Sequence, residues 1–373
     1  MKITEVNNKI TKKTFLDVAR VIYKDDKNWI CPLDNDIEAV FDPLKNNFHQ
    51  HGKCTRWILT GDDGKLLGRV AAFINNEKAY NYEQPTGGMG FFECINDEKA
   101  AFLLFDTAKN WLRANGMQAM DGPINFGEND NFWGLLVEGF TPPSYGMNYN
   151  HPYYQAFFEH YGFKKQYEQI TNHLGVNNPF PERFTKIANW VAQKPGYAFK
   201  HFETGKIAAF AEDFIEIYSD AWRDFENFVP ITYATILESF KKMKTIMDEK
   251  LIWFAYVDGE PASFVIIVPD ANQMIKTLNG KLDLIGKLKF LYYRWKGVSR
   301  MRAIVMGTKQ KYQKHGLESA LFIKLKEYVL PLKQYNELEL SWVGDFNDKM
   351  IALHHSMGST FGKKHLTMRY LFD

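Results

Sequence analysis

The chain has 373 residues, more than a single core usually supports, so two domains are expected. Hydrophobic residues make up 45% and aromatic residues 16% of it, which allows sizeable cores and excludes a disordered chain. With 46 basic and 44 acidic side chains the net charge is only +2, so the composition does not indicate a highly charged nucleic-acid-binding surface, although local basic clusters remain open.

The cysteines and the N-terminus indicate the compartment. Cys31, Cys54 and Cys94 lie far apart, are odd in number and lack the spacing of metal ligands, so they are predicted to be isolated thiols in a reducing compartment. Residues 1–15 contain no apolar signal core, and no later apolar run is long enough to cross a bilayer. The sequence therefore predicts a soluble cytoplasmic protein without a bound metal or a membrane partner.

The first half alternates helical and strand patterns. Residues 14–23 have helical periodicity, and an extended loop with Trp29, Pro32 and Pro43 follows. The elements predicted after this loop are a hairpin at 56–74, a strand at 88–95, a helix at 99–115, a strand at 117–126, a short helix at 153–161 and a strand at 163–174.

The second half repeats this order. Its predicted elements are a helix at 207–218, an aromatic segment at 221–232, a helix at 232–243, a hairpin at 251–268, a strand at 303–308, a helix from 317, a strand at 336–343, a helix from Asn347 to Gly358 and a strand at 365–372. The shared order predicts two copies of one α/β unit, with domains at 1–178 and 179–373.

A basic turn in the second copy connects a strand to a helix. Residues 303–306 are apolar, residues 309–316 carry lysines, a histidine and Gly316, and the following helix shows one apolar face with Leu317, Leu321 and Leu325. Such a turn presents backbone N–H groups and the positive end of a helix dipole, which together receive phosphate. An ordinary turn whose lysines only face water is the alternative.

This order of elements, with its basic turn, resembles the GCN5-related N-acetyltransferase (GNAT) family. The two-copy layout is similar to that of N-myristoyltransferases and Fem-type aminoacyl transferases. The family's pyrophosphate loop, Q/R-x-x-G-x-G/A, matches Gln313, Lys314, His315, Gly316 and Leu317, and departs from the pattern at Glu318. The resemblance implies two tandem acyl-CoA N-acyltransferase domains, each a mixed, mostly antiparallel sheet flanked by helices, that use acetyl-CoA or another acyl-CoA.

Further residues take roles from this resemblance. Backbone groups at Met306, Gly307 and Thr308 match those that hold pantetheine and polarise the thioester carbonyl. Asn347 matches the start of the family's late helix, and His354 stands in the place of its tyrosine, where an imidazole would protonate the leaving sulfur. A surface or packed histidine is the more common alternative.

No general base stands out. Glu339 is the first candidate and Asp345 the second. Because strand side chains alternate, Glu337, Glu339 and Ser341 are expected on one face, and a solvated face is the favoured interpretation of the carboxylate pair.

The first copy lacks the phosphate loop. Its equivalent turn, 93–98, is acidic and contains no glycine, so CoA is assigned to the second copy. The first copy instead carries DGPINFGENDNFWGLL, which resembles a stretch of uncharacterised bacterial two-copy acetyltransferase-like proteins. The amides of Asn125, Asn129 and Asn131 either line an acceptor pocket or satisfy their own turn, and the turn is favoured.

Two aromatic segments also allow two interpretations. The cluster of tyrosines and phenylalanines at 145–158 is expected to form core and domain interface rather than an acceptor wall. Segment 287–302 combines basic and aromatic residues, and an amphipathic helix that packs its aromatics is favoured over a nucleic-acid contact.

The sequence therefore predicts an acyl-CoA-dependent N-acyltransferase, with acetyl as the expected group. It would transfer the acyl group to a small-molecule or peptide amine by direct attack on the thioester. Two alternatives stay open, a non-catalytic scaffold of the same fold and a Fem-like transferase that uses aminoacyl-tRNA. The oligomeric state is open.

Overall fold

The computed structural model describes residues 1–224 and 230–372. Its elements are β1 (Lys2–Glu5), α1 (Lys9–Ile22), α2 (Asp34–Val40), η1 (Asn47–Gln50), β2 (Gly52–Thr60), β3 (Leu66–Asn75), β4 (Thr86–Cys94), α3 (Glu98–Ala114), β5 (Ala119–Gly122), β6 (Leu135–Glu138), α4 (Tyr154–Tyr161), β7 (Lys164–Gly175), α5 (Glu182–Ala192), β8 (Tyr197–His201), η2 (Thr204–Lys206), α6 (Ile207–Trp222), α7 (Tyr233–Met243), η3 (Glu249–Leu251), β9 (Ile252–Val257), β10 (Glu260–Pro269), α8 (Ala271–Ile275), α9 (Leu284–Lys296), β11 (Arg300–Thr308), η4 (Gln310–Tyr312), α10 (Leu317–Leu332), β12 (Glu337–Glu339), β13 (Val343–Gly344), α11 (Asp348–Ser356) and β14 (Thr360–Leu371).

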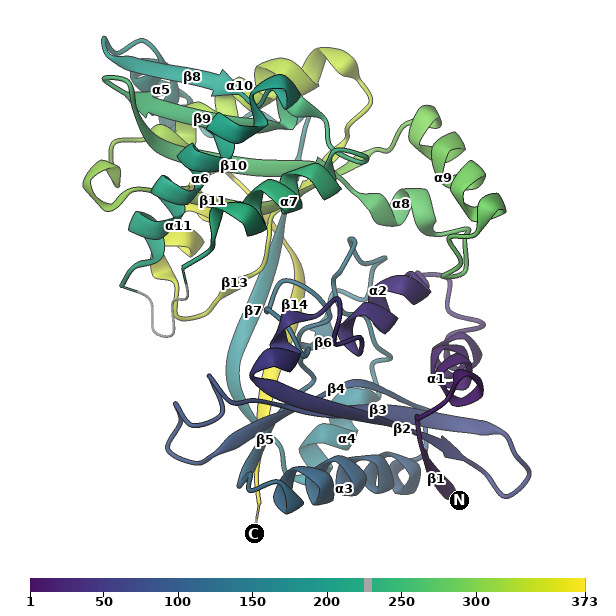
Figure 1. Cartoon of the computed structure of the whole chain (residues 1–373). Coiled ribbons are helices and arrows are strands. Elements are labelled where there is room, and N and C mark those ends of the chain that lie inside the picture. Colours follow the sequence, from purple (N-terminus) through teal and green to yellow (C-terminus); the bar gives the residue numbers. More distant parts are fainter. Residues whose placement is uncertain (225–229, 373) are drawn as a thin grey trace.

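One mixed sheet runs through both halves of the molecule (Figure 1). Its strand order is β1-β2-β3-β4-β5-β14-β7-β12-β11-β10-β9-β8, with β6 paired to β14 and β13 paired to β7. The β4–β5 and β11–β12 pairs are parallel, and the other pairs are antiparallel. The predicted α/β class with mostly antiparallel sheets flanked by helices is confirmed.

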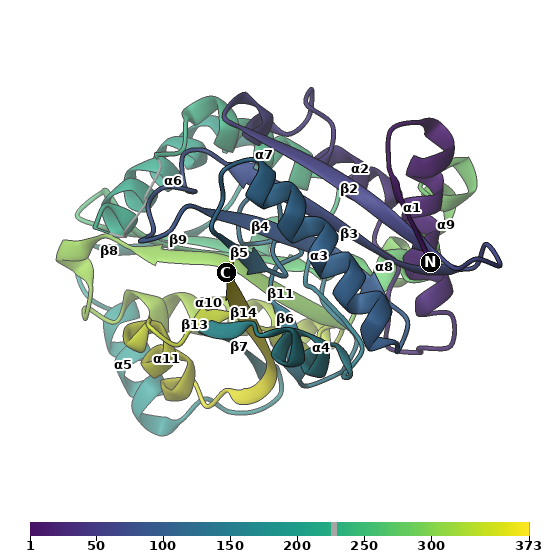
Figure 2. The ribbon, with the colours of Figure 1, turned by 90° about the horizontal axis from the view of Figure 1, so that it is seen from below.

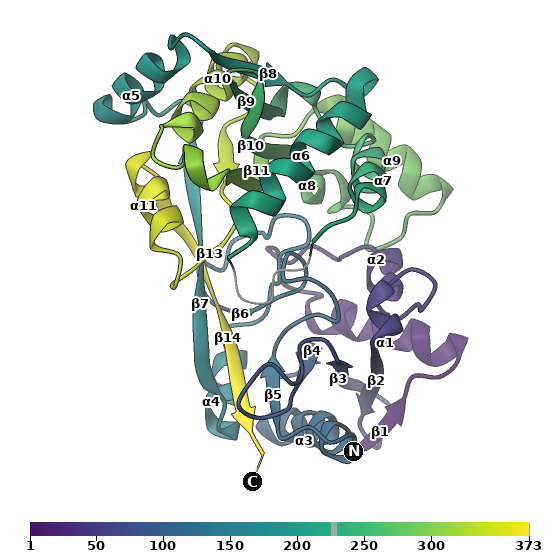
Figure 3. The same ribbon diagram turned by 60° about the vertical axis from the view of Figure 1, so that its left-hand side comes forward.

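The two halves exchange their last strands. β7 and β14 pair with each other from Lys164↔Arg369 to His173↔Thr360, and they run side by side between the halves (Figure 3). β14 also pairs with β5 of the first half, and β7 also pairs with β12 of the second. The division into 1–178 and 179–373 remains a prediction, and the terminal strand of the second range completes the sheet of the first.

Amphipathic helices cover the sheet. α3 begins at Asp97, whose side chain accepts hydrogen bonds from the backbone N–H groups of Lys99 and Ala100, and it lies across the first-half strands (Figure 2). α3 buries Leu104 and Phe105 in the first core, while α10 buries its apolar face in the second core, where it packs against α5, β9 and β10. Each half therefore has its own apolar core.

Some predictions for individual elements were wrong. The expected loop after Trp29 contains α2, which buries only Ile37 and Val40 and is too short to show helical periodicity. Segment 287–302 does begin in a helix, α9, but most of its apolar side chains face outward rather than packing. Part of the predicted aromatic segment, 225–229, lies outside the described residues. Among the residues described, no helix is both long and apolar enough to cross a bilayer.

A buried ion pair ties the exchanged strand to the second half. Lys363 of β14 donates to Glu339 of β12 at 2.9 Å, and both side chains are 1% exposed. The imidazole of His173, on the intervening β7, lies 3.4 Å from the same carboxylate. The solvated face expected for Glu337 and Glu339 is therefore wrong for Glu339, because β7 and β14 cover that strand.

Replacing Lys363 with methionine should lower the free energy of unfolding by about 3–5 kcal/mol, because it leaves the Glu339 charge buried without its cation. Urea denaturation followed by circular dichroism measures this loss. The double variant K363M/E339Q should recover a large part of the loss, because it removes the unpaired charge as well. If K363M were as stable as the parent, the ion pair would not hold β14 in place.

Candidate functional site

The parallel strands of the second half separate soon after they pair. β11 and β12 pair only over Arg300–Arg302 and Glu337–Glu339. A register shift against β10 leaves Ile304 as an extra residue in β11, which is a β-bulge. Ser341 then donates to the carbonyl of Ile304 at 2.8 Å. Beyond this bulge, no strand among the described residues pairs with residues 305–308 on the β12 side.

The basic turn forms an uncapped helix start. Gly316 is the N-cap of α10 in the left-handed conformation, with φ 78°, and no side chain caps the helix. Backbone N–H groups of the first turn therefore remain available to an anion, and the helix dipole favours one there. Lys314 and His315 are exposed beside it. Lys314, Gly316 and Leu317 thus lie together at this helix start, and their role in binding CoA remains a prediction.

Most cations of the turn are already paired. Lys309 is buried and contacts Glu216 and Glu260, and Lys311 and Tyr312 also donate to Glu260. These contacts, with the lysines foremost, lower the pKa of Glu260 to about 2. His315 lies 3.1 Å from the Tyr197 hydroxyl, and Gln313 accepts from Lys349. Within the described residues Lys314 makes no ion pair, so it is the cation of this turn that can meet a phosphate.

The departure from the family pattern at Glu318 is accommodated. Its carboxylate accepts a hydrogen bond from the Thr308 hydroxyl at 2.6 Å, and Thr308 also contacts Ser263 at 2.7 Å. The carboxylate is thereby drawn toward the end of β11. Gly307 lies against the Trp222 ring, because a Cβ atom there would come within 2.4 Å of it, and Met306 packs partly on the second core. The Trp222 ring covers Gly307 and the Thr308 hydroxyl is already bonded, which leaves the free backbone edge of β11.

The residues predicted after β12 have mainly structural contacts. Asn347 caps α11 by accepting from the Met350 N–H at 3.2 Å. His354 is buried, its Nδ1 accepts from the Asn172 amide at 3.1 Å, and burial lowers its pKa to about 4. It is therefore neutral near pH 7, which suits a hydrogen-bond donor at Nε2 better than a cationic acid. Asp345 is exposed.

Glu339 does not fit the proton-accepting role predicted for it. Burial alone would raise its pKa, but contact with His173 and the charges of Lys363 and Arg300 bring the pKa well below its ordinary value. A carboxylate so stabilised in its charged form is a poor base.

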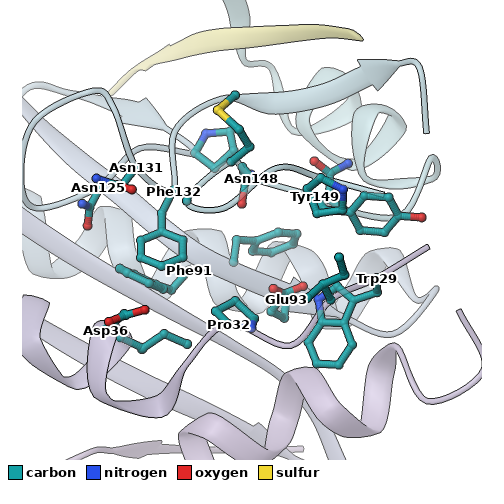
Figure 4. A pocket seen from close by; sticks show the side chains of 18 of the residues that line it. Trp29, Pro32, Asp36, Phe91, Glu93, Asn125, Asn131, Phe132, Asn148 and Tyr149 are labelled. Atoms are coloured by element: carbon teal, nitrogen blue, oxygen red, sulfur yellow. The ribbon is translucent and has the colours of Figure 1, made fainter. Parts of the chain in front are cut away.

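The main cavity, of about 320 Å³, lies in the first half, where β4 and β5 separate in the same way. Phe91 has a left-handed φ of 49° beside a register shift against β3, so β4 also bulges there. Figure 4 shows the carboxylate of Glu93 between Pro32 and Trp29, with Asn125 at one end and Tyr149 at the other. One part of the lining is apolar and aromatic: Trp29, Ile30, Pro32, Ile37, Val40, Phe91 and Phe132.

Glu93 is a buried carboxylate that lines this cavity. It accepts from the hydroxyls of Tyr23 at 2.5 Å and Tyr154 at 3.0 Å, and Arg69 lies 3.5 Å away. Burial raises its pKa, and these partners only partly oppose the shift. A carboxyl group with a raised pKa is suited to accept a proton near neutral pH.

Two other side chains of the cavity carry polar atoms without a partner. Arg69 Nε and Asn125 Oδ1 are buried and make no hydrogen bond within the described residues. Buried polar atoms are usually paired, so these two are ready to meet a polar ligand. With Glu93 they give the cavity one donor, one acceptor and one proton-accepting carboxylate.

The favoured interpretation of the Asn-rich stretch fails at Asn125, whose Oδ1 bonds no group of the turn within the described residues. Asn125 and Asn131 both line the cavity, and Asn125 does not satisfy its own turn. In the cluster at 145–158, Tyr154 and Phe158 lie in the first core, and both also line the cavity. Glu93 could not be recognised from local sequence patterns, because its partners Tyr23 and Arg69 come from distant elements.

The loop that walls the cavity also contacts the second half. Arg302 of β11 donates to the backbone carbonyls of Tyr145 and Asp130, and Trp342 donates to the carbonyl of Asn129 at 3.2 Å. Arg300 and Asp270 form a buried ion pair at 2.7 Å beside the same loop. The cavity of the first half thus borders the separated strands of the second half.

Comparison with solved structures defines the class of fold. A tandem GNAT protein from the clavulanic acid biosynthesis pathway superposes with a TM-score of 0.59 at 13% identity, covering 99% of this chain and 98% of that one. A GCN5-related N-acetyltransferase from Sphaerobacter thermophilus gives 0.51 at 10% identity, covering 85% and 80%. The chain therefore has a tandem GNAT-like fold.

Sequence comparison places the chain within that class. It is 30% identical to the bacterial ceramide synthase of Caulobacter vibrioides, over 97% of this chain and 95% of that protein. It is 27% identical to protein YghO of Escherichia coli, over 94% and 90%. No family model matches it. The chain belongs to the family of the bacterial ceramide synthase.

The low pKa of His354 predicts a pH effect on stability. The unfolded chain takes up a proton near pH 6.5 that the folded chain resists until about pH 4, so stability should fall as the pH drops through this interval. In urea denaturation from pH 7 to 5, H354Q should reduce this slope by up to about 1.4 kcal/mol per pH unit. The exposed His160→Gln is the control. An unchanged slope in H354Q would show that this imidazole is not held neutral.

Proposed function

We propose that this protein is an acyl-CoA-dependent N-acyltransferase that acylates the amine of a long-chain amino alcohol. The observation that carries the proposal is the start of α10 at Gly316, where no side chain within the described residues caps the helix, and which follows a strand with a free backbone edge. The similarity to a protein named bacterial ceramide synthase supports it, because a ceramide is a long-chain base acylated on nitrogen. That name also favours a long acyl chain over the acetyl group expected from the sequence.

The donor is assigned to the second half. The pyrophosphate of CoA would meet the first N–H groups of α10 and the ammonium of Lys314. The equivalent helix of the first half, α3, does not offer such a site, because the carboxylate of Asp97 occupies its first N–H groups and repels anions. The pantetheine would follow the free edge of β11, where backbone groups near Met306 are not used by a neighbouring strand.

The acceptor is assigned to the cavity of the first half. Its aromatic and aliphatic wall suits a hydrocarbon chain, and its polar atoms suit an amino alcohol. Asn125 Oδ1 would accept from a hydroxyl group, Arg69 Nε would donate to one, and Glu93 would face the amine. The loop contacted by Arg302 and Trp342 brings this cavity next to β11.

The reaction then needs no covalent enzyme intermediate. The neutral amine attacks the thioester carbon, a C–N bond forms, and the C–S bond breaks. The amine loses a proton to Glu93, directly or through a water molecule, and the departing thiolate of CoA takes up a proton from solvent. Donors at the bulged strand edge would stabilise the oxyanion.

Replacing Lys314 with glutamate should weaken CoA binding about tenfold, because a carboxylate replaces the ammonium beside the pyrophosphate. Isothermal titration with CoA measures this. Lys333→Glu is a matched control, since Lys333 is also an exposed lysine with a left-handed backbone, but at the opposite end of α10. If both variants weakened binding equally, or the parent did not bind CoA at millimolar concentration, the donor site would be refuted.

Replacing Glu93 with glutamine should reduce turnover by at least a hundredfold while leaving CoA binding intact, because it removes the proton acceptor. Release of free CoA thiol with a long-chain amino alcohol measures turnover. Glu38→Gln is the matched control, because Glu38 also pairs with an arginine, Arg56, but does not line the cavity.

Because E93Q disturbs a buried pair, Tyr23→Phe provides a milder test of the same carboxylate. It removes one hydrogen bond that stabilises the charged form of Glu93, so the acidic limb of the pH–rate profile should move to higher pH. A parent protein that binds CoA but releases no thiol with any amine would instead support the non-catalytic alternative.

A further inference from the structure

The outer face of α9 is apolar and uncovered. Its exposed apolar side chains are Leu284 (75% exposed), Ile285 (65%), Leu288 (61%), Leu291 (54%), Tyr292 (53%) and Trp295 (83%). At 3.6 residues per turn these six fall within an arc of about 120°, so they form one stripe along the helix. Such a stripe on a folded protein usually marks a surface that binds another protein, a membrane or a ligand.

The opposite side of α9 attaches the helix to the protein. Gly286 is buried, Phe290 packs against a cluster that contains Leu33 and Ile275, and Tyr293 packs against the second core. Figure 1 shows α9 on the outside of α8, away from the sheet. The helix is therefore held in place by its inner face and presents the outer stripe to its surroundings.

Basic side chains border the stripe on both edges. Lys287 and Arg294 lie along one edge, and Lys289 and Lys296 along the other, and all four are exposed. The helix contains no acidic residue. An apolar stripe between two rows of cations matches the boundary of a bilayer, where the apolar groups enter the acyl region and the cations meet anionic headgroups. A protein partner would not require cations along both edges.

The position of α9 connects this surface to the cavity. The cluster that receives Phe290 also contains Ile30 and Tyr145, and both of these line the cavity. One layer of side chains therefore separates α9, at Phe290, from the cavity proposed to bind the acceptor.

We propose that α9 binds the interface of an anionic phospholipid bilayer and places the cavity of the first half beside it. The docking stands on the helix alone, while delivery of a lipid acceptor from the bilayer rests on the proposed function. This replaces the expectation of a protein without a membrane partner.

Flotation of the full chain with vesicles tests the docking. The protein should float with vesicles of phosphatidylcholine that contain roughly 30–40% phosphatidylglycerol. The floating fraction should be at least about tenfold smaller with phosphatidylcholine alone or at high salt. The variant L288E/L291E/W295E should lose flotation. The matched control L44E/W190E changes two equally exposed apolar residues elsewhere and should float like the parent.

Two further experiments, one on the basic side chains and one on self-association, test the docking independently. K287Q/K289Q/R294Q/K296Q should weaken binding to anionic vesicles at least tenfold without changing the melting temperature. Size-exclusion chromatography with light scattering should show the same mass for the parent and L288E/L291E/W295E. A parent that forms a dimer through this stripe, or that ignores the vesicles, would overturn the proposal.

Turnover distinguishes this proposal from the proposed function. With an amino alcohol delivered in detergent micelles, L288E/L291E/W295E should keep the parent rate, but with the acceptor embedded in anionic vesicles it should lose at least tenfold. Vesicle binding without any turnover would refute the proposed reaction and leave the docking intact. Equal losses in micelles and vesicles would refute the docking as the cause.

Discussion

The pairing of β7 with β14 is the constraint on which the rest of the structure depends. Each half ends in a long strand that completes the sheet of the other half, so neither sheet is whole without its partner. The buried pair of Lys363 and Glu339 adds a charged link across β7, and Arg369 donates to Asp121 of β5 at 2.6 Å and 2.8 Å. Two sites on different halves are thereby held in a fixed relation.

The two copies share the same strand order but differ at the helix that follows their fourth strand. Both keep a bulged fourth strand that separates from its parallel neighbour, at Phe91 in the first half and Ile304 in the second. The helix start that follows is closed by Asp97 in one copy and left open at Gly316 in the other. The copy with the closed start contains the cavity of about 320 Å³. The proposed division between donor and acceptor is based on these differences, because the carboxylate of Asp97 repels an anion at one helix start and the dipole of α10 favours one at the other.

The sequence was sufficient to predict those features that local residue patterns encode. Hairpins, long amphipathic helices, their repetition and the open turn at Gly316 all depend on residues close together in the chain, and the structure has them. The carboxylate of Glu93 looked like one more acidic residue of a turn, because Tyr23, Arg69 and Tyr154 reach it from three separate elements. Glu339 failed as a base for the same reason, since the strand that buries it lies far away in sequence. The outward orientation of the apolar stripe on α9 could not be predicted either. Periodicity shows that a helix has an apolar face but not which way the face points.

The cavity and the helix beside it follow a common physical logic. An ammonium group loses hydration energy when it leaves water for an apolar site, whereas a neutral amine loses much less. In the proposed reaction, a buried carboxyl whose pKa is raised by desolvation would accept the proton where water is scarce, so that the nucleophile would be neutral next to the thioester. The hydrocarbon tail of such an acceptor would resist a path through water, and the stripe from Leu284 to Trp295 offers it a path from a bilayer instead. The buried charge and the exposed apolar stripe, each unfavourable by itself, are both accounted for by a substrate with an amine at one end and a lipid chain at the other.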